Sequence, residues 1–276
     1  MATDKLRMTI ARRAETDIML SPAWCALPLI GGIISIAITI WLIMTYGFHM
    51  PASAYVILRA ASLIPFVLML YLIYMLIKRR NTHFRRTQEL FEDIVAMLRG
   101  ASAEKGVDLT GQLSLVERYL SEARMEEVEK SPVLWVILCI IPIVNIFAIL
   151  YVFYFLMEDW YEHERREDDM WTQVNSALTA LGYRPIDTRR PEPMPRRSFF
   201  VYLIIYIVLM FIAGLDILYV HSGFIAGLGI LWLIYWLYTL IKDPNNHMAS
   251  QARIEDDLMM ALGAPTAPPP TPPSVG

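Results

Sequence analysis

The sequence has few of the residues on which enzymes and nucleic-acid-binding proteins usually depend. Only 18% of its 276 residues are charged, and the formal net charge is −3. A surface that binds nucleic acid needs clustered lysine and arginine to neutralise phosphates, so this balance argues against nucleic acid as a partner. The sequence also contains no glycine-rich phosphate loop, nucleophile elbow or paired-cysteine motif. We therefore expect a protein that is not an enzyme and has no cofactor.

Apolar residues dominate instead. Hydrophobic residues make up 56% of the chain, and the mean hydropathy is +0.42, which is too apolar for an ordinary soluble domain. The two cysteines, Cys25 and Cys139, both lie in apolar runs without a nearby metal-ligand spacing, so we expect buried free thiols. The composition predicts an integral membrane protein.

Two pairs of long apolar runs predict helices that cross the bilayer and return. The first pair covers residues 22–46 and 54–77, and the last covers 198–219 and 224–241. Each run approaches or exceeds the roughly 20 residues that a helix needs to cross the hydrocarbon. The first pair ends in Lys78, Arg79 and Arg80, whereas its tip carries no charge. Because positive residues favour the cytoplasmic side, we expect the N-terminus and C-terminus inside the cell membrane.

The middle apolar run, residues 132–157, is shorter and is interrupted by Pro142 and Asn145. One interpretation is a single proline-kinked helix that spans the bilayer. The other is a turn at residues 142–145, with two short helices forming a re-entrant hairpin. We favour the second because it leaves the sequence after each run on the same side of the membrane.

A motif is written three times, once after each apolar region. It begins Y-x-x-Y-x-L and ends in a histidine, and a polar helical pattern that closes near Gly100, Gly182 or Gly263 follows each copy. The sequence thus predicts an all-α protein of three helical hairpins, with five or six membrane segments and a cytoplasmic amphipathic helix after each hairpin. We place the copies at residues 1–130, with an extra amphipathic helix, at 131–190 and at 191–263, and expect a disordered proline-rich tail at 264–276.

The middle copy resembles a family of prokaryotic membrane domains of unknown function, built from short two-helix hairpins. The similarity rests on S-P-V-L-W-V-I-L at residues 131–138, a turn, and Y-V-F-Y-F-L at 151–156. An N-x-H-like step of that family fits Asn81 and His83, and also Asn245 and His247, whereas Tyr161 precedes Glu162 and His163 in the middle copy. The resemblance implies an architecture and no activity.

The shared spacing within the three copies singles out six tyrosines and three histidines. We interpret the tyrosines as an aromatic belt in the headgroup region that also permits packing between copies. The histidines are most simply interfacial residues, because no acidic residue stands at a constant offset to orient the rings, and we assign no metal ligand. The alternative is that they converge on a three-imidazole metal site. The residues are Tyr71, Tyr74, His83, Tyr151, Tyr154, His163, Tyr235, Tyr238 and His247.

Three further polar residues lie at membrane depth: Arg59, Asn145 and Asp216. Ionisable groups there are costly, which makes them candidates for a function, and a structural ion pair of Arg59 with Asp216 is the simpler expectation. Our leading hypothesis is a non-catalytic multi-pass scaffold or accessory subunit that presents cytoplasmic amphipathic helices to the lipid bilayer, a membrane-protein partner or a second copy. The alternative is a small transporter or channel with a route near these three residues.

Overall fold

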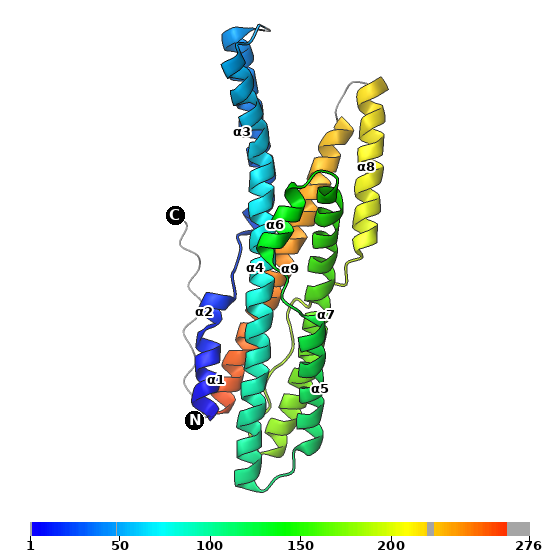
Figure 1. The fold of residues 1–276 in the computed structure, drawn as a ribbon. Helices are drawn as coiled ribbons and strands as arrows, with labels where there is room; N and C mark the ends of the chain where they lie inside the picture. The colour runs from blue at the N-terminus through cyan, green and yellow to red at the C-terminus, as the bar shows by residue number, and fades with distance from the viewer. Residues whose placement is uncertain (1, 48, 220–223, 264–276) are drawn as a thin grey trace.

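Three long helices organise the structure. The computed structural model describes residues 2–47, 49–219 and 224–263, and these residues are helical apart from their connecting segments (Figure 1). The long helices are α4 (Ala52–Lys105), α7 (Val144–Ala180) and α9 (Phe224–Ala261). Each begins in an apolar segment and continues without a break into a polar one. The shorter elements are α1 (Ala2–Ala11), α2 (Arg13–Thr16), the 3₁₀ turn η1 (Pro22–Ala26), α3 (Leu27–Tyr46), α5 (Thr110–Glu126), α6 (Pro132–Ile140) and α8 (Phe199–Tyr219).

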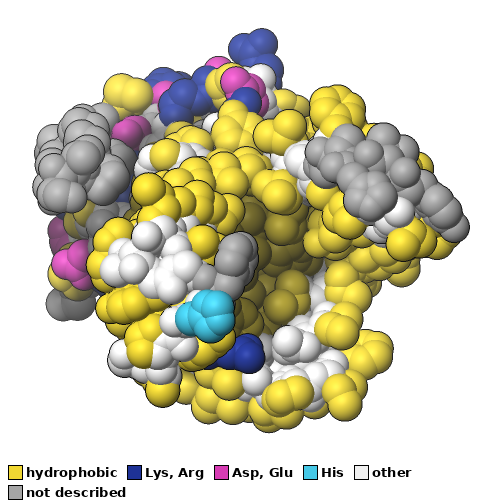
Figure 2. All heavy atoms as spheres, turned by 90° about the horizontal axis from the view of Figure 1, so that it is seen from above, with side chains coloured by type: hydrophobic (Ala, Val, Ile, Leu, Met, Phe, Trp, Pro, Cys, Tyr) yellow, Lys and Arg dark blue, Asp and Glu magenta, His cyan; other side chains and the backbone are white. Residues whose placement is uncertain are grey.

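Five helices of the described residues are long and apolar enough to cross a membrane. Their hydrophobic side chains are turned outward: Trp41, Met44 and Phe211 are all exposed. Figure 2, which looks down on the ends of these helices, shows mostly hydrophobic side chains around a hollow. Such a surface is stable in hydrocarbon and not in water, so the protein is a membrane protein. The spans lie within Pro22–Tyr46, Ala52–Lys105, Val144–Ala180, Phe199–Leu218 and Phe224–Ala261.

The middle apolar run is broken into two helices. Helix α6 ends at Ile140, and α7 begins at Val144 after a turn in which Ile143 has a φ of 70°. Pro142 favours this break because it lacks the N–H that a continuing helix would need. With 9 residues, α6 is about 14 Å long, roughly half the hydrocarbon thickness. It packs against α7 and α4, and residues 132–157 form two helices and not one continuous kinked helix.

Helices α3 and α4 pack closely at Gly31 of α3. A Cβ atom added there would lie 2.7 Å from Cα of Pro65 in α4, whereas one added at the neighbouring Gly32 would meet nothing within 4 Å. The missing side chain of Gly31 therefore sets the distance between the two helices.

We expect Gly31→Ala to lower the thermal stability of the purified protein, because backbone atoms cannot move aside as a flexible side chain would. Overpacking of this kind costs about 1–3 kcal/mol. Gly32→Ala is the matched control and should leave the unfolding temperature in detergent unchanged. Equal unfolding temperatures for the two variants would contradict the close approach.

Beyond the apolar segments, the second halves of α4, α7 and α9 pack with α1 and α5 around one hydrophobic core (Figure 1). The apolar positions of the three copies meet here, and Leu98, Leu178 and Leu258 are fully buried. The apolar positions of the three copies therefore shield one another from the surroundings of the protein. The proline-rich tail predicted at 264–276 lies outside the described residues.

Candidate metal centre

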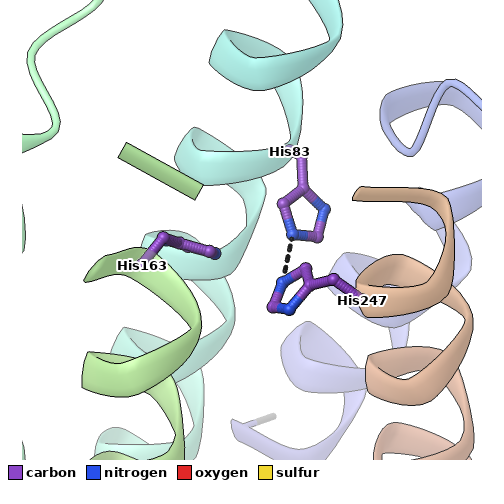
Figure 3. Close-up of side chains that lie close together, drawn as sticks. All are labelled: His83, His163 and His247. Atoms are coloured by element: carbon purple, nitrogen blue, oxygen red, sulfur yellow. Dashed lines mark hydrogen bonds between the residues drawn. The ribbon is translucent and has the colours of Figure 1, made fainter. Parts of the chain in front are cut away.

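The three histidines of the repeated motif meet between the three long helices. His83 lies on α4, His163 on α7 and His247 on α9, with exposed fractions of 0%, 2% and 0%. Their candidate ligand atoms lie within 4.8 Å of one another. Nε2 of His83 is 3.1 Å from Nε2 of His247, and the ring of His163 points toward both (Figure 3).

The three rings therefore lie in the interior of the bundle and not on its surface. Equivalent positions on three parallel-running segments face the same axis, so one side chain from each copy enters the interior of the bundle. Their convergence is the placement that the alternative, a site of three imidazoles, predicts.

Each imidazole also contacts a carboxylate through its other nitrogen. Nδ1 of His83 lies 3.0 Å from Asp17, and Nδ1 of His163 lies 3.0 Å from Glu127. Nδ1 of His247 lies 2.8 Å from Glu164. Where a neutral imidazole donates its Nδ1–H to an ionised carboxylate, which can only accept a hydrogen bond, its Nε2 keeps a lone pair. This is the tautomer that binds a metal ion through Nε2, with the carboxylate orienting the ring.

Arginines hold two of these carboxylates in the ionised form. Arg86 donates to both oxygens of Asp17, at 3.0 Å and 2.9 Å, and Arg166 donates to Glu127. Burial would raise the pKa of Asp17, but the neighbouring His83 and Arg86 outweigh it and lower the pKa to about 2. The same opposing effects act on Glu127. Burial would raise its pKa, but His163 and Arg166 outweigh burial and lower the pKa to about 2. Both carboxylates therefore stay charged at neutral pH.

Aromatic rings enclose two of the histidines. The ring of Trp160 stacks on His83 with 5.2 Å between centroids, and Phe84 stacks on His163 at 3.9 Å. Trp160 and Phe84 are themselves buried. Because no ring edge faces solvent, charges at this centre interact in a medium of lower dielectric constant than water.

The sequence prediction missed the carboxylates, although the sequence carries a signal for two of them. Asp17 and Glu127 each stand four residues before a Ser-Pro pair, Ser21-Pro22 and Ser131-Pro132, that opens an apolar run. The histidines they contact each begin an H-x-R-R sequence, and the second arginine of each is the one that holds the carboxylate.

The third copy departs from this pattern. Met194 stands four residues before Ser198, and Ser250 stands where the other copies have arginine. The carboxylate of Glu164 from α7 replaces the missing one, with its second oxygen accepting from the backbone N–H of Met194. A local pattern could not have found this partner.

The tyrosines of the motif do not converge on this centre. Tyr71, Tyr151, Tyr154 and Tyr235 are exposed on the outside of the helices, and Tyr74 and Tyr238 are half-buried. Their contacts are with local aromatic rings; Tyr71 packs near Trp24, for example, and Tyr151 stacks on Trp135.

The three polar residues predicted at membrane depth also lie apart. Arg59 is exposed near the start of α4, Asn145 is half-buried at the start of α7, and Asp216 is half-buried near the end of α8. The arm formed by α3 and the first half of α4 diverges from the arm formed by α8 and α9 (Figure 1). The ion pairs given for the described residues do not include one between Arg59 and Asp216, and their pairing stays a prediction.

We expect Asp17→Asn and Glu127→Gln each to weaken transition-metal binding by about 10–100-fold, the usual effect of removing a carboxylate that orients a ligating histidine. Each change keeps the shape of the side chain and removes its charge. Glu129→Gln is the control, since Glu129 is exposed and pairs with Arg85 at the surface. Competition with a chromophoric chelator measures the affinities. If Asp17→Asn and Glu127→Gln bind the metal ion with unchanged affinity, these carboxylates do not orient ligating histidines.

Three imidazoles with ligand atoms within 4.8 Å of one another could provide the ligand set of several first-row divalent ions, and zinc sites with three histidines are common. In comparisons with known proteins, no family model, curated protein or solved structure matches this chain.

Proposed function

We propose that this protein is a non-catalytic membrane-anchored scaffold whose three long helices are tied together by one divalent transition-metal ion, bound at His83, His163 and His247. The observation that carries the proposal is the common arrangement of the three rings. Each presents Nε2 to the shared centre and holds its Nδ1 on a buried or nearly buried carboxylate. One copy of the repeated motif supplies each ligand, so the ion would join all three copies.

The polar groups at the centre favour a cation. Nε2 of His247 lies 3.1 Å from Nε2 of His83 and 3.3 Å from Oε2 of Glu167, which places three electron-rich atoms together. Nε2 of His163 is buried and has no hydrogen-bond partner among the described residues. An unsatisfied buried polar group costs about 1–3 kcal/mol, and a bound cation would relieve it.

The charges around the centre support the same conclusion. Four carboxylates contact the imidazoles: Asp17, Glu127, Glu164 and Glu167. Among the described residues, the arginines in contact with these four groups are Arg86, Arg166 and Arg190. One negative charge is left in excess. A proton on an imidazole would cancel that excess, and a divalent ion would turn it into one positive charge, so a direct metal titration is necessary to tell them apart.

Burial of the site favours a structural role over a catalytic one. Catalytic zinc sites keep one coordination position open to substrate, whereas structural sites are closed. Here Trp160 and Phe84 cover the rings. The alternative of a transporter has less support, because Arg59, Asn145 and Asp216 lie on three different helices, α4, α7 and α8.

The experiment that tests the proposal is metal analysis of the full chain purified in detergent. We expect one tightly held ion per chain by mass spectrometry of the digested protein, or one equivalent of Zn²⁺ taken up after stripping with a chelator. A protein that takes up no ion under either condition would overturn the proposal and favour a protonated histidine cluster.

In the proposed orientation, the metal centre and both termini face the cytoplasm. The support is the positive charge that follows the first pair of apolar runs at Lys78, Arg79 and Arg80. The connection between α3 and α4 would then lie on the outer side of the membrane, and the far end of α4 on the inner side.

Single introduced cysteines test this orientation. We expect Ser53→Cys, exposed in the first turn of α4, to react with an impermeant reagent in intact cells. Ala103→Cys, exposed near the end of the same helix, should react only after permeabilisation. The opposite pattern would invert the topology. The native Cys25 and Cys139 are buried, and the wild-type chain gives the background.

A further inference from the structure

The geometry points to Glu167 as a fourth ligand, which would complete a closed tetrahedral centre of three imidazoles and one carboxylate for Zn²⁺. This inference rests on the proposed function, because it specifies the coordination and the ion of the same site. It changes what the centre can do: with four protein ligands, no position is left for a substrate or water.

The position of the carboxylate is the first argument. Glu167 is fully buried, and its Oε2 lies 3.3 Å from Nε2 of His247. Bonds of about 2.0–2.1 Å in a tetrahedron place neighbouring ligand atoms about 3.3–3.4 Å apart. The separation of Glu167 from His247 falls at this value, and that of His83 from His247, 3.1 Å, is close to it. The two separations measured from Nε2 of His247 thus match those between ligands of one ion, while Glu167 stands outside the group of three histidines whose ligand atoms all lie within 4.8 Å of one another.

The spacing along α7 is the second argument. Glu167 follows His163 by four residues, so both side chains lie on one face of the same helix. Pairs of ligands at this spacing chelate zinc in the H-E-x-x-H helix, where the helix supplies both without a change of backbone. Helix α7 would therefore contribute two ligands, and α4 and α9 one each.

The third argument is that Glu167 is already oriented. Trp171 donates from Nε1 to its Oε1 at 2.8 Å, and Arg190 donates to its Oε2 at 2.8 Å. Arg190 comes from the linker between α7 and α8, and its side chain is almost completely buried. A carboxylate oxygen has a second lone pair, so Oε2 can accept from Arg190 and bind an ion at the same time. Such outer contacts are typical of ligating carboxylates.

Comparison of the three copies shows how Glu167 differs from the residues at the equivalent positions. The positions four residues after the histidines are Thr87, Glu167 and Gln251, and all three are buried. Gln251 donates from Nε2 to the hydroxyl of Thr87 at 3.2 Å, and its own Oε1 has no partner among the described residues. Glu167 is the one ionisable residue of these three. Gln251 offers the competing oxygen, and the experiment must distinguish the two.

The donor set narrows the class of ion. Three nitrogens and one oxygen in a closed site suit Zn²⁺ and its spectroscopic substitute Co²⁺, whereas Mg²⁺ and Ca²⁺ prefer six or more oxygens. The thiols belong to another part of the molecule, since Cys25 and Cys139 pack in the hydrophobic cluster of the apolar segments. A thiolate-bound ion is therefore not the expected occupant.

The test is a Co²⁺ titration of the purified full chain, followed by visible absorption, which is intense for four-coordinate and weak for six-coordinate Co²⁺. We expect the wild-type protein to bind one equivalent with the four-coordinate spectrum. Glu167→Gln should bind at least about tenfold more weakly and lose that spectrum as water enters. Asp169→Asn, the same kind of change at an exposed position on α7, should behave as wild type.

The possible outcomes separate the two proposals. No Co²⁺ or Zn²⁺ bound by the wild-type protein would overturn the proposed function. Normal binding with an unchanged spectrum in Glu167→Gln would overturn only the fourth ligand, and a loss confined to Gln251→Leu would move that role to Gln251. If Glu167→Gln does not fold, X-ray absorption of the Co²⁺-loaded wild-type protein decides: four nitrogen or oxygen neighbours support the inference, and five or more overturn it.

Discussion

Replacing His163 with glutamine should abolish tight binding of the ion. Structural zinc sites contribute about 10–16 kcal/mol of apparent binding free energy, and we expect loss of one imidazole to remove at least about 4 kcal/mol, or about a thousandfold in affinity. His163 is the most informative of the three because its Nε2 is buried without a partner among the described residues. His83→Gln and His247→Gln should give losses of the same order, since each ring comes from a different helix.

The matched control is His49→Gln, which makes the same change at an exposed histidine outside the bundle. Thermal unfolding separates loss of the ion from general damage. An ion that binds the folded chain raises its stability by about 4 kcal/mol at a thousandfold excess over the dissociation constant. We expect added Zn²⁺ to raise the unfolding temperature of wild type and of His49→Gln, but not of His163→Gln. A metal-induced rise in all three proteins would place the ion elsewhere.

The apolar runs and the break in the middle one could be predicted from the sequence because they depend on local composition. A helix needs a minimum apolar length to span hydrocarbon, and proline ends a helix wherever it occurs. The repeated motif also singled out the three histidines that lie together between the long helices. What the repeat alone could not supply was the direction in which those positions face.

The partners of the histidines could not be predicted in the same way. The carboxylates lie 66, 36 and 83 residues away in sequence from the rings they contact, so no constant offset from the histidine points to them. In two copies the constant offset is instead from the Ser-Pro pair that follows Asp17 and Glu127. The distance from that pair to the histidine differs because the first copy has long membrane helices and the second has a short α6.

The third partner shows the limit of repeat-based inference. Glu164 lies on α7 and serves His247 on α9, while Arg190 reaches Glu167 from a linker that has no repeat pattern. These contacts exist only because the copies differ from one another. Sequence symmetry predicts three equivalent ligands, and the asymmetric residues decide how the centre is completed.

A charge placed in the hydrophobic core beyond the apolar segments should have the second large effect. Leu178 is fully buried among residues of α4, α5 and α7. Leu178→Asp would bury a carboxylate without a partner, at a cost of several kcal/mol unless the group is protonated. Folded domains are stable by only about 5–15 kcal/mol, so this change should unfold most of the bundle. Ser176→Asp, at an exposed position two residues earlier on α7, is the control.

The decisive measurement for Leu178→Asp is its metal content, because the substitution touches none of the proposed ligands. The hydrophobic core and the metal centre share α4, α7 and α9, so the histidines can converge only while these helices are packed. We expect the variant to insert into the membrane through its apolar segments, to lose the bound ion and to expose the bundle to protease. A variant that keeps both the ion and its protease resistance would show that the centre forms without the core. The histidines and their carboxylates would then have to hold the three helices together unaided.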